Sequence, residues 1–198
     1  MIRSFCLTIR EHRILRLDLP TIAYHMITII SSTNRPNSKS FVVAQAYQNL
    51  LADMGEPCQL LDLKDLPSDF AGPNLYDQSE AKMQVLIEQF IRKSNKFVFV
   101  IPEYQGSFPG VLKSFLDGIS PRDFKEKKAA IIGVSDGRAG NLRGQDHLTS
   151  ILNYLKVNVH YSKPKLSQIN TLIDDAGHWI QSETEAMLKQ HAADFIAF

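Results

Sequence analysis

The sequence lacks the features that mark several protein classes. Its two cysteines, Cys6 and Cys58, are isolated, so we predict neither a disulfide framework nor a metal site and expect a reducing, cytoplasmic location. No apolar run approaches the roughly 18 residues that cross a bilayer, which argues against a membrane partner. The 22 basic and 21 acidic residues give a net charge of +1, so no nucleic-acid partner is indicated.

Two phosphate-binding motifs are absent as well. Neither GxxxxGK[ST] nor GxGxxG occurs in the chain. Their absence argues against a nucleoside triphosphatase and against a dinucleotide fold of the glycine-fingerprint type. The chain also has no internal repeat and no dividing linker, so its 198 residues fit one sizeable domain.

The first 25 residues differ from the rest of the chain. Among their basic residues, Arg10, Arg13 and Arg16 interrupt any apolar stretch that could form the core of a signal peptide. We interpret residues 1–25 as an N-terminal extension outside the domain proper, with a targeting arm as the alternative. Residues 26–198 are then the domain itself.

Short apolar runs alternate with amphipathic segments from Met26 onward. Several of these runs are continuous, which is typical of strands in a parallel sheet covered on both faces. The predicted strands are Ile27–Ser31, Cys58–Leu63, Lys96–Ile101, Ala129–Val134 and Val157–Tyr161.

The segments between these strands have helical spacing. Val43, Ala46, Leu50 and Met54 recur on one helical face, and a second apolar face runs from Met83 to Ile91. Further helices are predicted over Gly110–Ile119, Gln145–Leu155 and Ile173–Lys189. This alternation predicts an α/β three-layer sandwich with helices on both faces of a five-stranded parallel sheet. The flavodoxin-like strand order 2-1-3-4-5 is the natural candidate.

The loop after the first predicted strand, "ISSTNRPNSKS", is unusually rich in hydroxyl groups. Thr33, Ser38 and Ser40 can donate hydrogen bonds, and Arg35 adds a fixed cation. The loop opens a helix, whose free N–H groups and dipole favour an anion. It therefore predicts a site for a phosphate monoester, with simple helix capping by Ser38 or Ser40 as the alternative.

Two later loops leave the same edge of the predicted sheet. In Pro102–Ser120, Tyr104 and Phe108 can offer aromatic faces to a planar ligand, although core packing of Tyr104 is the alternative. In Ser135–Gln145, several glycines allow the backbone to approach a flat heterocycle, although a plain surface loop is the alternative. These glycines are Gly137, Gly140 and Gly144.

Three segments resemble the signature segments of the NADPH-dependent FMN reductases, which are flavodoxin-like flavoproteins. They are "STNRPNSKS", "PEYQGSFPGVLKSFLDGIS" and "SDGRAGN", and the resemblance runs from about Met26 to Tyr161. It implies that Thr33, Arg35, Ser38 and Ser40 hold the FMN phosphate. It also implies that the isoalloxazine is lined by Pro102, Glu103, Tyr104, Gln105 and Gly106, and closed on its other side by Ser135, Gly137 and Gly140. The chain departs from the family pattern at Ser32, Gln105 and Gly118.

The resemblance also implies an activity. It predicts an oxidoreductase that passes hydride from NADPH (or NADH) to FMN and then to a flavin, quinone or similar small acceptor, with no catalytic side chain required. It implies a homodimer or homotetramer. We interpret Phe124–Lys128 as a solvated lead-in to the fourth strand, with contact between one of its lysines, or Arg138, and the 2′-phosphate of NADPH as the alternative. The alternatives are a flavodoxin-type electron carrier and an interaction module that keeps the fold without the flavin.

Overall fold

The sheet of this computed structural model, which describes residues 26–72, 75–76 and 81–198, is parallel throughout. Its strands follow the order β2-β1-β3-β4-β5, which confirms the predicted flavodoxin-like order. The interpretation of residues 1–25 as an extension lies outside the described residues. The five strands of this path are β1 (Ile27–Ser31), β2 (Cys58–Asp62), β3 (Lys96–Pro102), β4 (Lys128–Val134) and β5 (Asn158–Val159).

A sixth strand was not predicted, and the strand predicted over Val157–Tyr161 is reduced to two residues. The start of β4 pairs with β5, whereas its end, Gly133–Val134, pairs with β6 (Lys165–Leu166). Between them Pro164 has no N–H to donate to a ladder, although its carbonyl accepts from the N–H of Gly133 at 2.9 Å. The edge of the sheet is therefore shared by two short strands, which brings the segment after β6 close to the end of β4.

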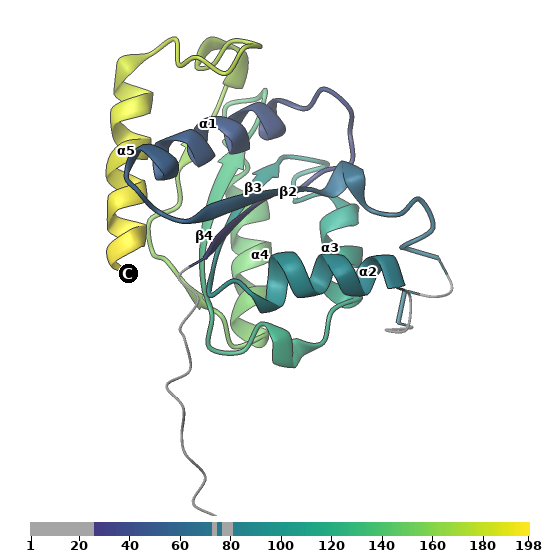
Figure 1. The fold of residues 1–198 in the computed structure, drawn as a ribbon. Helices are drawn as coiled ribbons and strands as arrows, with labels where there is room; N and C mark the ends of the chain where they lie inside the picture. Colours follow the sequence, from purple (N-terminus) through teal and green to yellow (C-terminus); the bar gives the residue numbers. More distant parts are fainter. Residues whose placement is uncertain (1–25, 73–74, 77–80) are drawn as a thin grey trace, which may run out of the picture.

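Helices cover both faces of the sheet, as predicted (Figure 1). Helices α1 (Lys39–Asp53) and α5 (Ser182–Ala197) pack on one face. The other face carries α2 (Ala81–Leu86), which continues as a π-helical segment over Ile87–Arg92, α3 (Gly110–Asp117) and α4 (Leu142–Tyr154).

The helix predicted over Ile173–Lys189 is wrong in its first part, because α5 begins only at Ser182. Residues 173–181 instead form a closed loop in which Ile173 bridges to Trp179. Gly177 has a φ of 88° in this loop, which is incompatible with a right-handed helix. Trp179 still packs against the core, as its apolar character predicts.

Alternation along β3 explains why its sequence is continuously apolar. Phe97, Phe99 and Ile101 point into the core beneath α2, α3 and α4. Val98 and Val100 point into the opposite core beneath α1 and α5. Since successive side chains of a strand face opposite sides, a strand buried on both faces must be apolar at every position.

The two helices that follow neighbouring strands β1 and β3 diverge to opposite faces of the sheet. Helix α1 lies in one layer and α3 in the other. This divergence leaves a crevice beyond the carboxyl ends of the two strands, the usual ligand position in such sheets. Within the described ranges, no helix combines the length and apolar character needed to cross a membrane.

Candidate functional site

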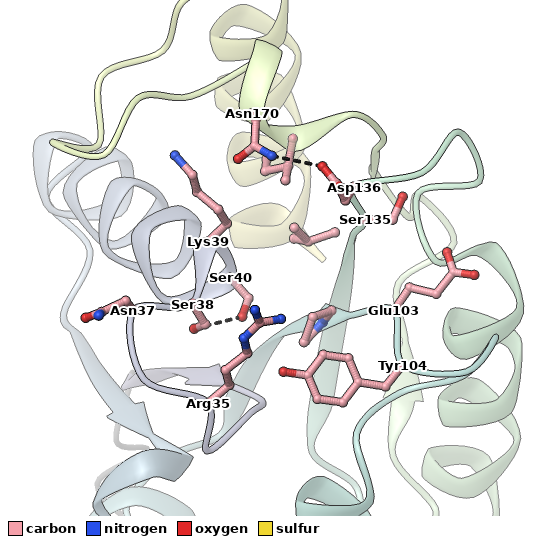
Figure 2. Close-up of a pocket in the computed structure, with 13 residues that line it drawn as sticks. Arg35, Asn37, Ser38, Lys39, Ser40, Glu103, Tyr104, Ser135, Asp136 and Asn170 are labelled. Carbon is pink, nitrogen blue, oxygen red and sulfur yellow. Dashed lines mark hydrogen bonds between the residues drawn. The ribbon is translucent and has the colours of Figure 1, made fainter.

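A pocket of about 400 Å³ lies beyond the carboxyl ends of β1, β3 and β4 (Figure 2). The three loops that the sequence singled out meet there, joined by a fourth segment, Ile169–Asn170, that follows β6. The lining residues are Arg35, Asn37, Ser38, Lys39, Ser40, Pro102, Glu103, Tyr104, Val134, Ser135, Asp136, Ile169 and Asn170.

Two buried serines form one wall of the pocket at the start of α1. Ser38 is the N-cap, because its hydroxyl oxygen accepts from the N–H of Phe41 at 3.2 Å. Ser40 donates its own hydroxyl proton to the Ser38 oxygen at 3.2 Å. Since Ser38 accepts both of these bonds, its own proton remains free for a ligand in the pocket. The capping alternative thus holds for Ser38 and leaves its donor capacity intact.

Two cations belong to this end of the pocket. The Arg35 side chain points into the space beside Ser40 in Figure 2, and it makes no ion pair with any residue that the structure describes. Lys39 is the first residue of α1, and its ammonium group lies 2.7 Å from a carboxylate oxygen of Asp175. It also donates to the carbonyl of Ile173 at 3.3 Å.

Thr33 joins two of the loops rather than lining the pocket. It is fully buried, and its hydroxyl shares a hydrogen bond of 2.9 Å with the Tyr104 hydroxyl. Its oxygen also accepts from the N–H of Arg35 at 3.2 Å. The hydroxyl of Thr33 thus positions the Tyr104 side chain and the backbone of Arg35.

The loop after β3 contains a tight turn from Tyr104 to Ser107. These two residues exchange backbone hydrogen bonds of 2.8 and 3.0 Å. Between them Gln105 and Gly106 have φ angles of 51° and 74°, the geometry of a type I′ turn, which favours glycine. Neither of the two is among the lining residues, whereas Tyr104 is half-buried against the pocket. Tyr104 belongs to neither hydrophobic core, so the core-packing alternative is not supported.

Glu103 is held by the start of α4. One of its carboxylate oxygens accepts from the N–H of Asn141 at 3.2 Å. Asn141 is fully buried, caps α4 through Gly144, and donates its amide to the carbonyls of Ile101 and Pro102. Asn141, which the sequence reasoning missed, thus fixes the end of β3 and one pocket wall together.

The loop after β4 is organised by Ser135. Its hydroxyl donates to the carbonyl of Gly137 at 2.8 Å and accepts from the N–H of Gly140 at 2.9 Å. Gly140 has a φ of 58°, and a Cβ there would lie 2.6 Å from the Cβ of Lys165. Gly137 is exposed. Of the three residues predicted to face the ring, Ser135 lines the pocket, while the two glycines shape the loop.

Sequence reasoning missed five lining residues besides Val134. Asn37 and Lys39 lie within the hydroxyl-rich loop and could have been included by position alone. Asp136 follows Ser135 directly. Ile169 and Asn170 had no signal, because they reach the pocket only through β6: the N–H of Ile169 donates to the carbonyl of Ser135, and Asn170 donates to Asp136 at 2.8 Å (Figure 2).

The lysines of Phe124–Lys128 cannot contact a ligand in this pocket. Lys125 and Lys127 precede β4 and Lys128 is its first residue, so all three lie at the amino ends of the parallel strands, opposite the pocket. Lys127 donates to the carbonyl of Ile91 and Lys128 to that of Phe198. Of the two alternatives for the 2′-phosphate, only Arg138 is on the pocket side, where it is exposed in the loop after β4.

Comparison with known proteins identifies the family. Residues 26–168 match the family described as NADPH-dependent FMN reductase. The chain belongs to this family. It is therefore an oxidoreductase that uses FMN and a nicotinamide donor. An NAD(P)H-dependent FMN reductase of Pseudomonas aeruginosa is 32% identical to this chain over 133 residues. The matched region covers 62% of the chain and 71% of the relative.

Two further comparisons agree with this assignment. A quinone reductase of Escherichia coli is 32% identical over 143 residues, which covers 71% of the chain and 74% of that protein. The structure of the flavoenzyme FerB, an NAD(P)H:acceptor oxidoreductase from Paracoccus denitrificans, superposes with a TM-score of 0.74 at 19% identity, covering 87% of the chain and 96% of FerB. At that identity the superposition supports the FMN reductase fold alone.

Proposed function

We propose that the pocket at the carboxyl edge of the sheet binds FMN and that the protein uses it to pass reducing equivalents from NADPH or NADH to a quinone-like acceptor. The observation that carries this proposal is the division of the pocket. Hydroxyls and cations come from the loop that opens α1, and the Tyr104 ring, the Glu103 carboxylate and the Ser135 hydroxyl come from the loops on the facing side.

The side chains present suit this cofactor. Arg35, Ser38 and Ser40 offer a cation and hydroxyls at a helix N-terminus, which is the donor set that a phosphate monoester prefers. The volume of about 400 Å³ falls within the range of roughly 300–1,000 Å³ that is usual for ligand pockets. When bound, FMN supplies the redox chemistry, and the protein supplies position and electrostatics.

Each wall of the pocket has its own part in this proposal. Arg35, Ser38 and Ser40 hold the phosphate, with Thr33 fixing the loop that carries Arg35. The isoalloxazine lies against the residues that line the opposite end, namely Pro102, Glu103, Tyr104 and Ser135. Gly106 and Gly140 provide the left-handed backbone on which the two ring-side loops depend, and Gln105 and Gly137 complete those loops.

The identity of the acceptor is proposed from the relatives. Besides the Escherichia coli protein, a 2-hydroxy-1,4-benzoquinone reductase of a Burkholderia species is 30% identical over 130 residues. We take a small quinone as the class of acceptor on this basis. By analogy with the family we also propose a homodimer or homotetramer, and a cytoplasmic location, with which the half-buried free thiol of Cys58 is compatible.

The experiment is a visible spectrum of the purified protein with added FMN, followed by NADPH under anaerobic conditions. Bands near roughly 375 and 450 nm report oxidised flavin, a general property of the cofactor. We expect these bands to bleach within seconds of NADPH addition and to return when benzoquinone is added.

The other outcomes separate the alternatives. Flavin that binds but bleaches only with dithionite would support an electron carrier and overturn the reductase proposal. No flavin binding would remove the phosphate role of Arg35, Ser38 and Ser40. Recovery of the bands with an azo dye but not with benzoquinone would retain the reductase and change the acceptor class.

A further inference from the structure

The charges that line the pocket do not, without Lys39, favour a dianion. Arg35 contributes one positive charge, and Glu103 and Asp136 contribute one negative charge each. A phosphate monoester carries close to two negative charges near pH 7, with its second pKa at about 6. Lys39 brings the sum of the lining charges from −1 to zero, so the charge balance of the pocket depends on it.

The two acidic residues of the lining are each engaged. Glu103 accepts from the N–H of Asn141 at the ring end of the pocket. Asp136 accepts from the side-chain amide of Asn170. Their two negative charges face the same pocket as Arg35 and add to the need for a second cation.

The ion pair that Lys39 makes is weak, and its other contact is a single hydrogen bond of 3.3 Å to the carbonyl of Ile173. The Asp175 side chain is 98% exposed, so water screens its attraction to the ammonium group despite a distance of 2.7 Å. The Lys39 side chain itself is only 24% exposed, and in Figure 2 it extends from the start of α1 away from Ser38 and Ser40. An ammonium group on a long flexible stem can reorient at low cost, whereas the serines beside it are held by the helix cap.

We propose that Lys39 is the second cation of the phosphate end and that Asp175 competes with the cofactor phosphate for it. This inference rests on the proposed function, because it concerns the same pocket. Asp175 belongs to residues 169–181, whose first two residues line the pocket. The Lys39–Asp175 pair therefore sets how tightly the protein retains FMN.

The test compares two ligands that differ only in the phosphate. Dissociation constants for FMN and for riboflavin are measured by flavin fluorescence with the full chain and with Lys39→Met, Lys39→Arg and Asp175→Asn. We expect Lys39→Met to weaken FMN binding about tenfold, which is the usual scale for a charge-assisted hydrogen bond. Asp175→Asn should tighten FMN binding about threefold, because it removes a competitor that is screened by water.

Two further results are required. Lys39→Arg should retain most of the FMN affinity, since it keeps the positive charge. In the double variant Lys39→Met with Asp175→Asn, the tightening by Asp175→Asn should disappear, because the residue for which Asp175 competes is gone. Riboflavin affinity should stay unchanged in every variant.

A matched control exists on α3. Lys113 and Asp117 form an ion pair of 2.6 Å that is also exposed and lies outside the pocket lining. Lys113→Met and Asp117→Asn change the net charge identically and should leave FMN affinity within about twofold, the range of ordinary surface substitutions.

The outcomes distinguish this inference from the proposed function. Equal losses of FMN and riboflavin affinity in Lys39→Met would indicate a structural role and overturn the inference. Unchanged FMN affinity in Lys39→Met, with tight binding by the unmodified chain, would also overturn it while leaving the FMN site standing. Failure of the unmodified chain to bind either flavin would instead overturn the proposed function.

Discussion

Ser38 shows at the scale of one residue how two interpretations of a sequence can both hold. The structure makes it the cap of α1, and the bonds that it accepts leave its proton available. In the proposed function the same hydroxyl donates to the FMN phosphate. Helix capping and anion binding use different parts of one hydroxyl group, so evidence for the first does not exclude the second.

Arg35→Ala tests the phosphate end directly. Loss of a charge-assisted hydrogen bond of about 1.5–3 kcal/mol should weaken FMN binding roughly tenfold to a hundredfold. Riboflavin, which lacks the phosphate, should bind with unchanged affinity. Fluorescence titration with both flavins measures the effect, and an FMN affinity equal to that of the unmodified protein would remove Arg35 from the site.

Gly133→Ala tests the close approach between β4 and the loop that follows it. A Cβ at this position would lie 2.1 Å from the carbonyl oxygen of Gly140, and backbone cannot move aside as a flexible side chain can. We expect a loss of about 3 kcal/mol in the free energy of unfolding, the upper range for overpacking in a core.

Gly110→Ala is the control for that substitution. A Cβ there meets nothing within 4 Å, and the residue opens α3. The free energy of unfolding of the Gly110→Ala variant, measured in urea, should match or exceed that of the unmodified protein, because alanine has a higher helix propensity than glycine. Equal stabilities of the two variants would contradict the packing argument.

Helix α5 contacts α1 through a pair of buried polar side chains. His191 is a residue of α5 that is only 3% exposed, and its Nδ1 is 2.9 Å from the Tyr47 hydroxyl of α1. Burial raises the pKa of Tyr47, so its hydroxyl stays protonated. Burial, with a smaller contribution from the nearby His160, lowers the pKa of His191 to about 4.

This lowered pKa predicts a loss of stability in acid. Above pH 6.5 His191 is neutral in both the folded and the unfolded chain, so it adds no pH dependence. Between pH 6.5 and about 4 the unfolded chain takes up a proton that the folded chain does not, and the free energy of unfolding falls by up to about 3 kcal/mol.

Urea unfolding of His191→Gln at pH 7 and pH 4.5 measures this loss. The variant should lose less stability between the two pH values than the unmodified protein does. His178→Gln, at a histidine whose side chain is 81% exposed, serves as the comparison and should follow the unmodified protein more closely. An identical acid loss in all three proteins would mean that other groups cause it.

The whole molecule has a core on each face of its sheet, and the pocket lies where the helices after β1 and β3 part. The family match begins at residue 26, one residue before β1. Of the described residues, those that line the pocket lie between 35 and 170. We therefore predict that the proposed FMN site does not need the first 25 residues.

A variant that starts at Met26 tests this division of the chain. Its FMN affinity and its rate of flavin bleaching by NADPH should stay within about twofold of those of the full chain, the scale of changes remote from a site. Loss of FMN binding in the truncated protein would mean that residues 1–25 belong to the working domain.

The sequence by itself determined strands β1 to β4, the layers and three of the pocket's loops. Strand residues that face two cores must be continuously apolar, and hydroxyl and glycine clusters mark the carboxyl ends of strands, so both signals are local. Only the tertiary structure brought Ile169 and Asn170 to the pocket, and Asp175 to Lys39. Ile169 and Asn170 reach the pocket because β6 pairs with the end of β4, and such pairing between distant segments leaves no periodic pattern in the chain.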